Sequence, residues 1–197
     1  MAALLSDGPL LWSVNRSSGM VLLALRTLTV LLGVSSMRGA AGTRVPRFAV
    51  QALHRNIGLL SLVMLLLHIF SAVLEEYVDI RWWHGFVPWG LHYEPLWLAL
   101  GVVAGDLMLA TALSSMVRTR LPPGAWRWVH RAAYPVWGLA LWHGLAIGTD
   151  TGLGWATAVY ATSGALVAAA LLLRVAGLGR RHDSPLPRER AAAGRLP

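Results

Sequence analysis

The sequence predicts an all-α fold: a polytopic membrane helical bundle of about five transmembrane helices. Of the 197 residues, 56% are hydrophobic and 13% are charged, and the mean hydropathy is +0.56. This composition is typical of a protein that crosses a membrane several times. We therefore expect a multi-pass protein of the cell membrane (inner or plasma membrane) whose surface contacts membrane lipid.

Five apolar stretches are long enough to span a bilayer, which takes about 20 helical residues. They cover residues 12–36, 51–74, 96–117, 125–148 and 155–175. The chain then divides into an N-terminal tail (1–11), a transmembrane domain (12–176) and a tail rich in proline, glycine and arginine (177–197). We expect the last segment to be a disordered cytoplasmic tail. The N-terminus lacks the basic region of a signal peptide, so the first span should be retained.

The charges are distributed unevenly among the connections. The 17 basic side chains are all arginines, and the net charge is +8. The loops after the first and third spans and the C-terminal tail are rich in arginine, whereas the other connections are neutral or acidic. Because positive residues mark the cytoplasmic side, this pattern predicts the N-terminus outside and the C-terminus inside. Membrane topology thus explains the basic charge, and no nucleic-acid partner is expected.

Cysteine is absent from the chain. Its absence excludes disulfides, thiolate metal sites, iron–sulfur clusters and covalent haem attachment. Histidine is therefore the main candidate ligand for any metal.

Two of the expected spans each carry a pair of histidines. His54 and His68 lie 14 positions apart in the second span, and His130 and His143 lie 13 apart in the fourth. Fourteen residues place two side chains within about 40° of the same helix face and about 21 Å apart along the axis. An ionisable residue inside a membrane marks a functional site by default.

The two histidine-bearing spans are both entered from the cytoplasmic side, so they run parallel. His54 and His130 should then face each other near the inner surface, and His68 and His143 near the outer surface. Each pair could supply the two axial ligands of a haem b iron, which predicts two haems, one above the other. The sequence shows no internal repeat beyond these paired helices.

The spacing of 13 in the fourth span does not fit a straight helix. Thirteen residues fall about 140° short of four turns, so the side chains of His130 and His143 would diverge. Pro135 lies between them, removes a backbone hydrogen bond and should kink the helix. The kink would permit the two imidazoles to face the same side.

Three arginines are candidate partners for haem propionates. Arg55 and Arg131 each follow a histidine of the inner pair, and guanidinium groups make strong charge-assisted hydrogen bonds to carboxylates. Topology alone explains these two arginines equally well. Arg26 lies near the centre of the first span and Asp106 near the centre of the third, so we expect either an ion pair between them or a propionate beside Arg26.

The remaining histidines lie outside the spans. His84 and His92 fall in the loop between the second and third spans, beside Trp82 and Trp83. We expect surface or interfacial roles for both, and this loop is where an outer electron acceptor would dock. His182 lies in the C-terminal tail, where we expect it to be solvated.

The segments FAVQALHRNIGLLSLVMLLLHIFSAVL and WRWVHRAAYPVWGLALWHG contain the four paired histidines. With these spacings, residues 12–175 resemble the ferric-reductase-like transmembrane domain family. That family includes ferric reductases, NADPH oxidases and the haem-binding membrane subunit of a bacterial periplasmic methionine-sulfoxide reductase system. The resemblance implies haem b iron ligated by His54, His68, His130 and His143, and electron transfer across the membrane.

Larger members of that family carry a cytoplasmic FAD- and NADPH-binding domain. The present sequence ends soon after the fifth span and contains no GxGxxG motif. We therefore expect a component of an oxidoreductase that receives electrons from a separate flavoprotein or from membrane quinol. Its acceptor at the outer face would be ferric iron, oxygen or a periplasmic redox partner.

Two other functions remain open from the sequence. One is a quinol-linked b cytochrome, because respiratory b cytochromes also use histidine pairs spaced by about 14. The other is a haem-free membrane protein whose histidines bind a metal ion or relay protons. Packing contacts between neighbouring helices are the simplest explanation of a single intramembrane histidine, but four histidines matched in depth favour a cofactor.

Overall fold

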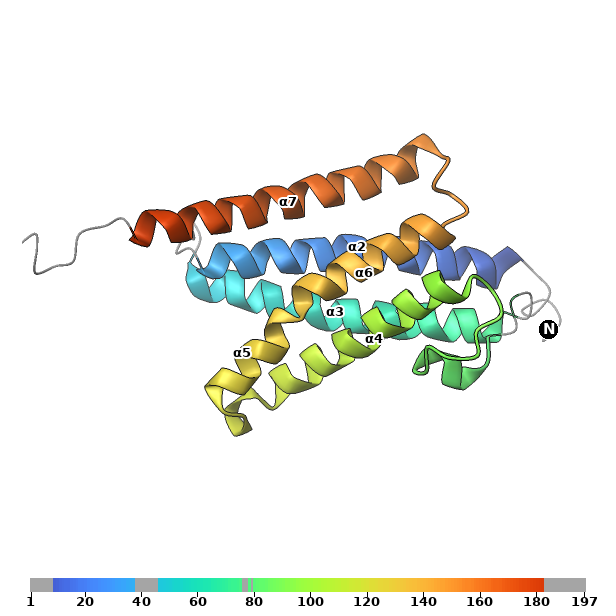
Figure 1. Cartoon of the computed structure of the whole chain (residues 1–197), viewed down its shortest axis with the longest axis horizontal. Helices are drawn as coiled ribbons and strands as arrows, with labels where there is room; N and C mark the ends of the chain where they lie inside the picture. The colour runs from blue at the N-terminus through green and yellow to red at the C-terminus, as the bar shows by residue number, and fades with distance from the viewer. Residues whose placement is uncertain (1–8, 38–45, 76–77, 79, 183–197) are drawn as a thin grey trace, which may run out of the picture.

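The computed structural model describes residues 9–37, 46–75, 78 and 80–182, and this part of the chain is all-α. Its elements are α2 (Pro9–Met37), α3 (Arg47–Leu74), the 3-10 helix η2 (Trp82–Gly85), α4 (Pro95–Met116), the 3-10 helix η3 (Arg118–Arg120), α5 (Pro123–Arg131), α6 (Ala133–Ile147) and α7 (Gly154–His182). Figure 1 shows the long helices running in the same general direction as a bundle.

Helix α2 lies in the middle of the bundle. It packs along α3 over most of its length, and it also contacts α6 and α7. The main partner of α4 is α6, which makes a second antiparallel pair beside the first. The four paired helices each contribute one side chain to a common buried cluster formed by Leu22, Leu65, Met108 and Val136.

Four helices are long and apolar enough to cross a membrane: residues Leu10–Ser36, Arg47–Leu74, Pro95–Met116 and Gly154–Ala176. They correspond to four of the five predicted spans and support a multi-pass membrane protein. Their surfaces are largely apolar and open to lipid, as the exposed side chains of Leu59, Val63 and Leu66 on α3 illustrate.

The fourth predicted span is divided into two shorter helices. The break falls at Ala132, between α5 and α6. Pro135 has no N–H to donate to the carbonyl of Arg131, four residues earlier. At the same place the backbone N–H of Ala132 bonds the carbonyl of Val129, three residues earlier, at 3.0 Å. The kink that Pro135 predicts is therefore present as a one-residue break at Ala132, whose backbone stays in the right-handed helical region.

The C-terminal boundary of the last span differs from the prediction. The predicted disordered tail starts at residue 177, but α7 continues to His182. The polar composition of this segment indicates that it is solvated, but solvated residues can continue a helix until a strong helix breaker occurs. The first proline beyond α7 is Pro185. Residues 1–8 of the predicted N-terminal tail and residues 183–197 lie outside the described residues.

Candidate functional site

The structure brings the four intramembrane histidines together as two pairs. The ring centroids of His54 and His130 are 6.1 Å apart, with an interplanar angle of 65°. Those of His68 and His143 are 6.2 Å apart, with an angle of 85°. The pairing by depth that the sequence predicts is therefore present, and the break before α6 brings both histidines of the fourth segment to the same side.

The Nδ1 atoms of three of these histidines each donate a hydrogen bond to a backbone carbonyl oxygen. The acceptors are Thr29 for His54 at 3.0 Å, Asn15 for His68 at 3.0 Å and Trp97 for His143 at 2.9 Å. A proton on Nδ1 leaves Nε2 with a free lone pair, which is the atom that ligates a metal.

His130 differs from the other three because its Nδ1 faces a side-chain hydroxyl at a longer distance. Its Nδ1 lies 3.4 Å from the hydroxyl oxygen of Ser115, and that hydroxyl donates to the carbonyl of Thr111 at 2.7 Å. The serine oxygen is thus free to accept the Nδ1 proton. All four imidazoles therefore have a neighbour at Nδ1, and the carbonyl acceptors fix the tautomer of His54, His68 and His143.

Small residues on the neighbouring helix make room for the imidazoles. A Cβ atom added to Gly19 would lie 3.1 Å from Cε1 of His68, and one added to Gly33 would lie 3.4 Å from Cε1 of His54. At Gly101 it would lie 2.5 Å from both Cε1 and Nδ1 of His143. The sequence analysis missed these glycines, although one signal was available: Gly19 and Gly33 are 14 residues apart, the same spacing as the two histidines they face.

The same arrangement occurs in both antiparallel helix pairs. In α2, the accepting carbonyl and the small residue four positions later are Asn15 and Gly19, then Thr29 and Gly33. In α4 they are Trp97 and Gly101, whereas His130 meets the hydroxyl of Ser115, which itself bonds the carbonyl of Thr111. Within each helix the two units are 14 residues apart. The residue types at these positions differ, and what recurs is the spacing of the residues that face the histidines.

The geometry fits a haem iron between the imidazoles of each pair. A bond between a metal and an imidazole nitrogen is about 2 Å long, so two imidazoles on opposite sides of one metal ion have ring centroids about 6 Å apart. The observed spacings have this value. Among the described residues, no group of three or more histidine, cysteine, aspartate or glutamate side chains gathers at a common point. Zinc sites take three or four protein ligands, whereas a porphyrin supplies four nitrogens and leaves two axial positions.

A cavity of about 230 Å³ adjoins the outer pair. His68, His143, Arg16, Arg26 and Tyr160 contribute to its lining. Because residues from α2, α3, α4, α6 and α7 all contribute, the cavity lies within the bundle. It offers the outer imidazoles a largely apolar setting with two cationic side chains.

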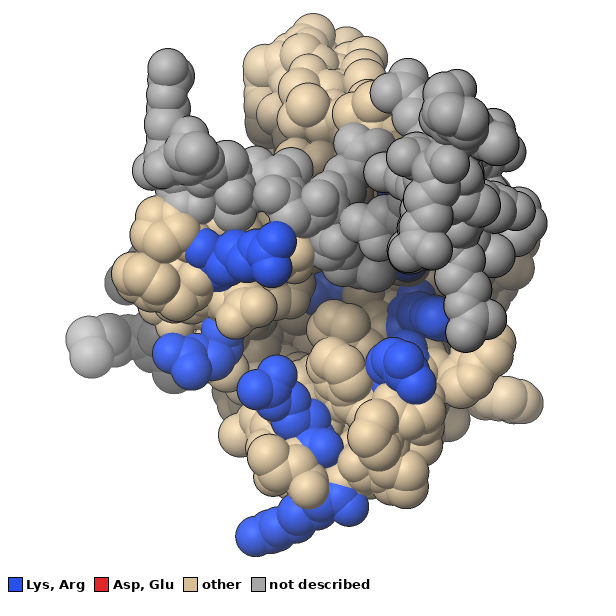
Figure 2. Space-filling model, turned by 90° about the vertical axis from the view of Figure 1, so that its left-hand side faces the viewer, with Lys and Arg blue, Asp and Glu red and all other residues tan. Residues whose placement is uncertain are grey.

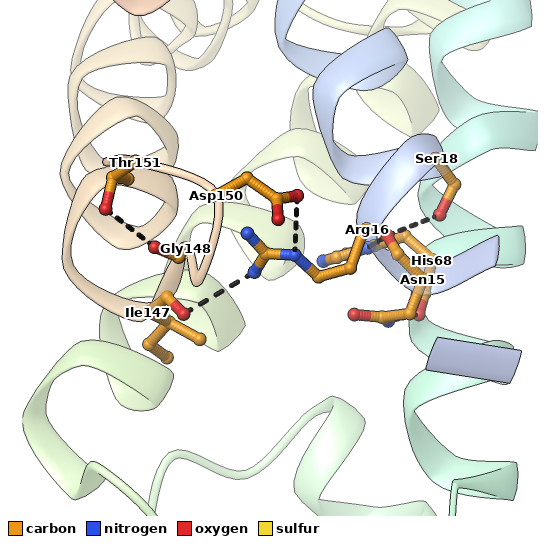
Figure 3. Close-up of polar contacts among 8 residues, drawn as sticks. All are labelled: Asn15, Arg16, Ser18, His68, Ile147, Gly148, Asp150 and Thr151. Carbon is orange, nitrogen blue, oxygen red and sulfur yellow. Dashed lines mark hydrogen bonds and ion pairs between the residues drawn. The ribbon is translucent and has the colours of Figure 1, made fainter. Parts of the chain in front are cut away.

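Arg16 crosses from α2 to the connection between α6 and α7 (Figure 3). Its Nε lies 3.4 Å from a carboxylate oxygen of Asp150, and its Nη1 donates to the carbonyl of Ile147 at 3.5 Å. The neighbouring Asn15 donates its side-chain amide to the carbonyl of His68 at 2.8 Å. The N-terminal end of α2 is thereby tied to both histidine-bearing segments.

Arg26 is buried between the levels of the two pairs. Its side chain is 6% exposed, and its Nε and Nη2 atoms have no hydrogen-bond partner among the described residues. It lies seven residues from Gly19 and seven from Gly33, so α2 presents it on the face that also meets the histidines. The predicted ion pair with Asp106 is absent: the ion pair in the described part of the chain joins Arg16 to Asp150.

Arg55 and Arg131, which each follow a histidine of the His54–His130 pair, are exposed. The guanidinium of Arg131 lies over the ring of Trp128, 5.2 Å from its centroid. Trp126 stacks on His130, with centroids 4.9 Å apart, and its indole N–H is buried without a partner among the described residues. The inner pair therefore has an unpartnered donor beside it that the sequence analysis did not single out.

The outer loop departs from expectation at one histidine. His84 is 6% exposed, accepts a hydrogen bond on Nδ1 from the backbone N–H of Arg81 at 3.2 Å, and lines the outer cavity. The surface position expected for His84 is therefore wrong, because η2 packs against α3 and α4, and the alternative of an interfacial role stays a prediction. His92 is exposed, in agreement with the surface role expected for it, and Trp82 beside this loop is exposed as well. His182 ends α7, and its side chain lies outside the described residues.

Comparisons of the chain with protein-family models, with curated proteins and with solved structures gave no match. What the fold and the site define is therefore a class: a multi-pass helical membrane protein with two histidine pairs at two depths.

Proposed function

We propose that this protein carries electrons across the membrane through two b-type haems, as in ferric-reductase-like membrane components. The observation that supports the proposal most strongly is the presence of two imidazole pairs with metal-ligand spacing, in which Nδ1 of three of the four rings donates to a backbone carbonyl. His54 and His130 would hold the inner haem iron, and His68 and His143 the outer. When bound, the haems supply a reversible one-electron change at iron.

The side chains around the iron ligands have separate tasks. The backbone acceptors orient the imidazoles and raise the basicity of Nε2. Arg26 supplies a positive charge and two free donor atoms at the depth between the pairs, where they would meet a carboxylate such as a propionate. Arg55 and Arg131 are further candidates for that role at the inner level, and the apolar walls of the bundle exclude water.

The orientation in the membrane follows from the distribution of arginine. Arg47 and Arg55 on α3, Arg118 and Arg120 on η3, and Arg127 on α5 are exposed at one end of the bundle. Figure 2 shows basic and no acidic side chains on the described part of this end. By the positive-inside rule this end is cytoplasmic, the N-terminus lies outside, and α5 with α6 completes the fifth span.

Electrons would accordingly enter at the inner pair and leave at the outer pair. The donor is a cytoplasmic flavoprotein or a membrane quinol, and the acceptor docks beside the loop that contains η2. In this scheme the chain is the haem-binding subunit of an oxidoreductase.

The test is a reduced-minus-oxidised visible spectrum of the purified protein, with haem quantified per chain. We expect a low-spin b-type spectrum and one haem per histidine pair. His54→Ala and His68→Ala should each remove one haem and leave the other. His92→Ala is the matched control, because His92 is exposed and belongs to neither pair.

A folded protein that stays colourless after expression with sufficient haem would refute the proposal and favour metal or proton transfer. Reduction of the haems by quinol without a flavoprotein would identify quinol as the donor. Loss of both haems in each single variant would show that the two pairs are not independent sites.

A further inference from the structure

Asp106 is an ionisable side chain near the centre of a span that takes no part in the two histidine sites or in the proposed function. It lies near the middle of α4, about 15 Å from either end at the helical rise. Its side chain is partly exposed, and neither an ion pair nor a hydrogen bond joins it to another described residue. A carboxyl group at this depth cannot reach water at either interface, and leaving it unpaired in hydrocarbon is costly.

Asp106 lies on the face of α4 that points away from the bundle. The buried residues of α4 include Ala104, Gly105 and Met108, and at about 100° per residue Asp106 falls opposite to the mean direction of the buried set. In Figure 1, α4 lies at an edge of the bundle, with its neighbours α3 and α6 on one side. The carboxyl group therefore faces the region that lipid or another helix would occupy.

Five further residues share this face. Spaced alternately by four and three positions, the outward stripe consists of Ala99, Val103, Asp106, Ala110, Leu113 and Val117. None of the six is buried, and Leu113 is 58% exposed. A 3.5-residue repeat is the seam along which two helices pack with a small left-handed crossing angle. Ala110, one turn from Asp106, permits close approach of a second backbone.

We propose that the outward stripe of α4 is a dimer interface with a second copy of this chain. In a two-fold dimer whose axis is normal to the membrane, α4 and its copy run parallel in the same register. Each residue of the stripe then meets its own equivalent at the same depth. The two Asp106 side chains face each other at the bilayer centre.

The carboxyl group of Asp106 can hydrogen-bond to an identical carboxyl group, which favours a second copy of this chain as the partner. A carboxylic acid both donates and accepts hydrogen bonds, so two acids, or one acid and one carboxylate, satisfy each other. Lipid tails offer no such partner, and hydrogen bonds across helices stabilise membrane assemblies. The interface goes beyond the proposed electron transfer and holds whether or not haem is bound.

The absence of cysteine makes a disulfide cross-linking test direct. Ala110→Cys and Leu113→Cys place single thiols on the stripe, and Leu66→Cys on the exposed face of α3 is the matched control. In native membranes under mild oxidation, we expect covalent dimers from the two stripe variants and none from the control. Adding Asp106→Leu should lower the dimer yield about tenfold, whereas Asp106→Asn, which keeps a donor and an acceptor, should retain it.

The same variants are compared by mass photometry in lipid nanodiscs, and helix content is followed by circular dichroism to establish folding. Monomers in nanodiscs with no stripe cross-link would overturn the proposal. So would equal cross-linking of the α3 control, which indicates random collision. Replacing Ala110 with a photoreactive amino acid tests for other occupants: if it captures a different membrane protein instead of a second copy, the self-association is refuted.

Discussion

Glycine faces three of the four paired imidazoles, and the space available at each differs. An added Cβ would collide with the His143 ring at Gly101, press on His68 at Gly19 and make nearly ordinary contact with His54 at Gly33. The space for an added methyl group therefore decreases from Gly33 to Gly19 to Gly101. The outer site should be more sensitive to added volume than the inner site.

Gly101→Ala should displace the His143 ring and remove the outer haem, since Cε1 and Nδ1 of that ring both lie 2.5 Å from the position of the new methyl group. Gly33→Ala should leave both haems in place. Gly105→Ala on the same helix is the control, because its methyl group would meet only Leu65 at 3.7 Å. Haem content per chain and the spectrum of each variant measure the effect. Equal haem content in the Gly101 and Gly105 variants would contradict the assignment of His143 as a ligand.

Replacing Arg26 should change the thermal stability of the haem-free and the haem-loaded protein in opposite directions. In the haem-free protein its charge is buried without a partner among the described residues, so Arg26→Met should raise the midpoint temperature. In the haem-loaded protein the same change should lower it, because a propionate would lose its partner. The midpoint potential of one haem should also fall, on the order of 50 mV, since a nearby positive charge favours the reduced form. Thermal unfolding of both forms and a redox titration are the measurements; the same stability change in both forms would exclude a propionate partner.

At the scale of the helix, the interruption between α5 and α6 corrects the spacing of 13. Pro135→Ala restores the N–H that the carbonyl of Arg131 lacks and favours one continuous helix. His130 should then turn away from His54 by a large part of the 140° mismatch, at about 100° per residue. We expect loss of the inner haem with retention of the outer haem, measured by haem content and by the low-spin signals in electron paramagnetic resonance.

Pro123→Ala is the matched control, because Pro123 is the first residue of α5, where its missing N–H has no intrahelical acceptor. Its haem content should be unchanged. If Pro135→Ala kept both haems, the break would be held by packing around Ala132 rather than by the proline.

The helices and the histidine pairs could be predicted from local pattern, and their surroundings could not. An apolar stretch of sufficient length predicts a membrane span, and histidines at matched depths in two spans predict a pair. Neither prediction requires knowledge of which helices are in contact. The partners of the imidazoles depend on the register between antiparallel helices, for example Gly19 beside His68 and Gly33 beside His54. That register is set by tertiary packing, which a reading of one segment at a time does not contain. Burial of His84 was missed for the same reason, since it depends on how η2 folds over the bundle.

For the whole molecule, the orientation in the membrane gives the direction of the proposed electron path. Exposed arginines gather at the end where α3 begins and α4 meets α5, whereas the connection between α6 and α7 contains Asp150. The first end should be cytoplasmic. A protein inserted in the opposite sense would carry its inner pair on the outside, so the direction of transfer would have to be reversed.

Single-cysteine labelling measures this orientation, because the chain has no cysteine of its own and thus no background. Gly152→Cys in the α6–α7 connection and Thr119→Cys in η3 both place thiols at exposed positions. A membrane-impermeant maleimide should label Gly152→Cys in intact cells and Thr119→Cys only after the membrane is opened. Because the two positions lie at opposite ends of the α5–α6 segment, this result would also establish that the interrupted segment crosses the bilayer. Labelling of both from outside would mean that α5 and α6 together do not span, and the reverse pattern would place the arginine-rich end outside.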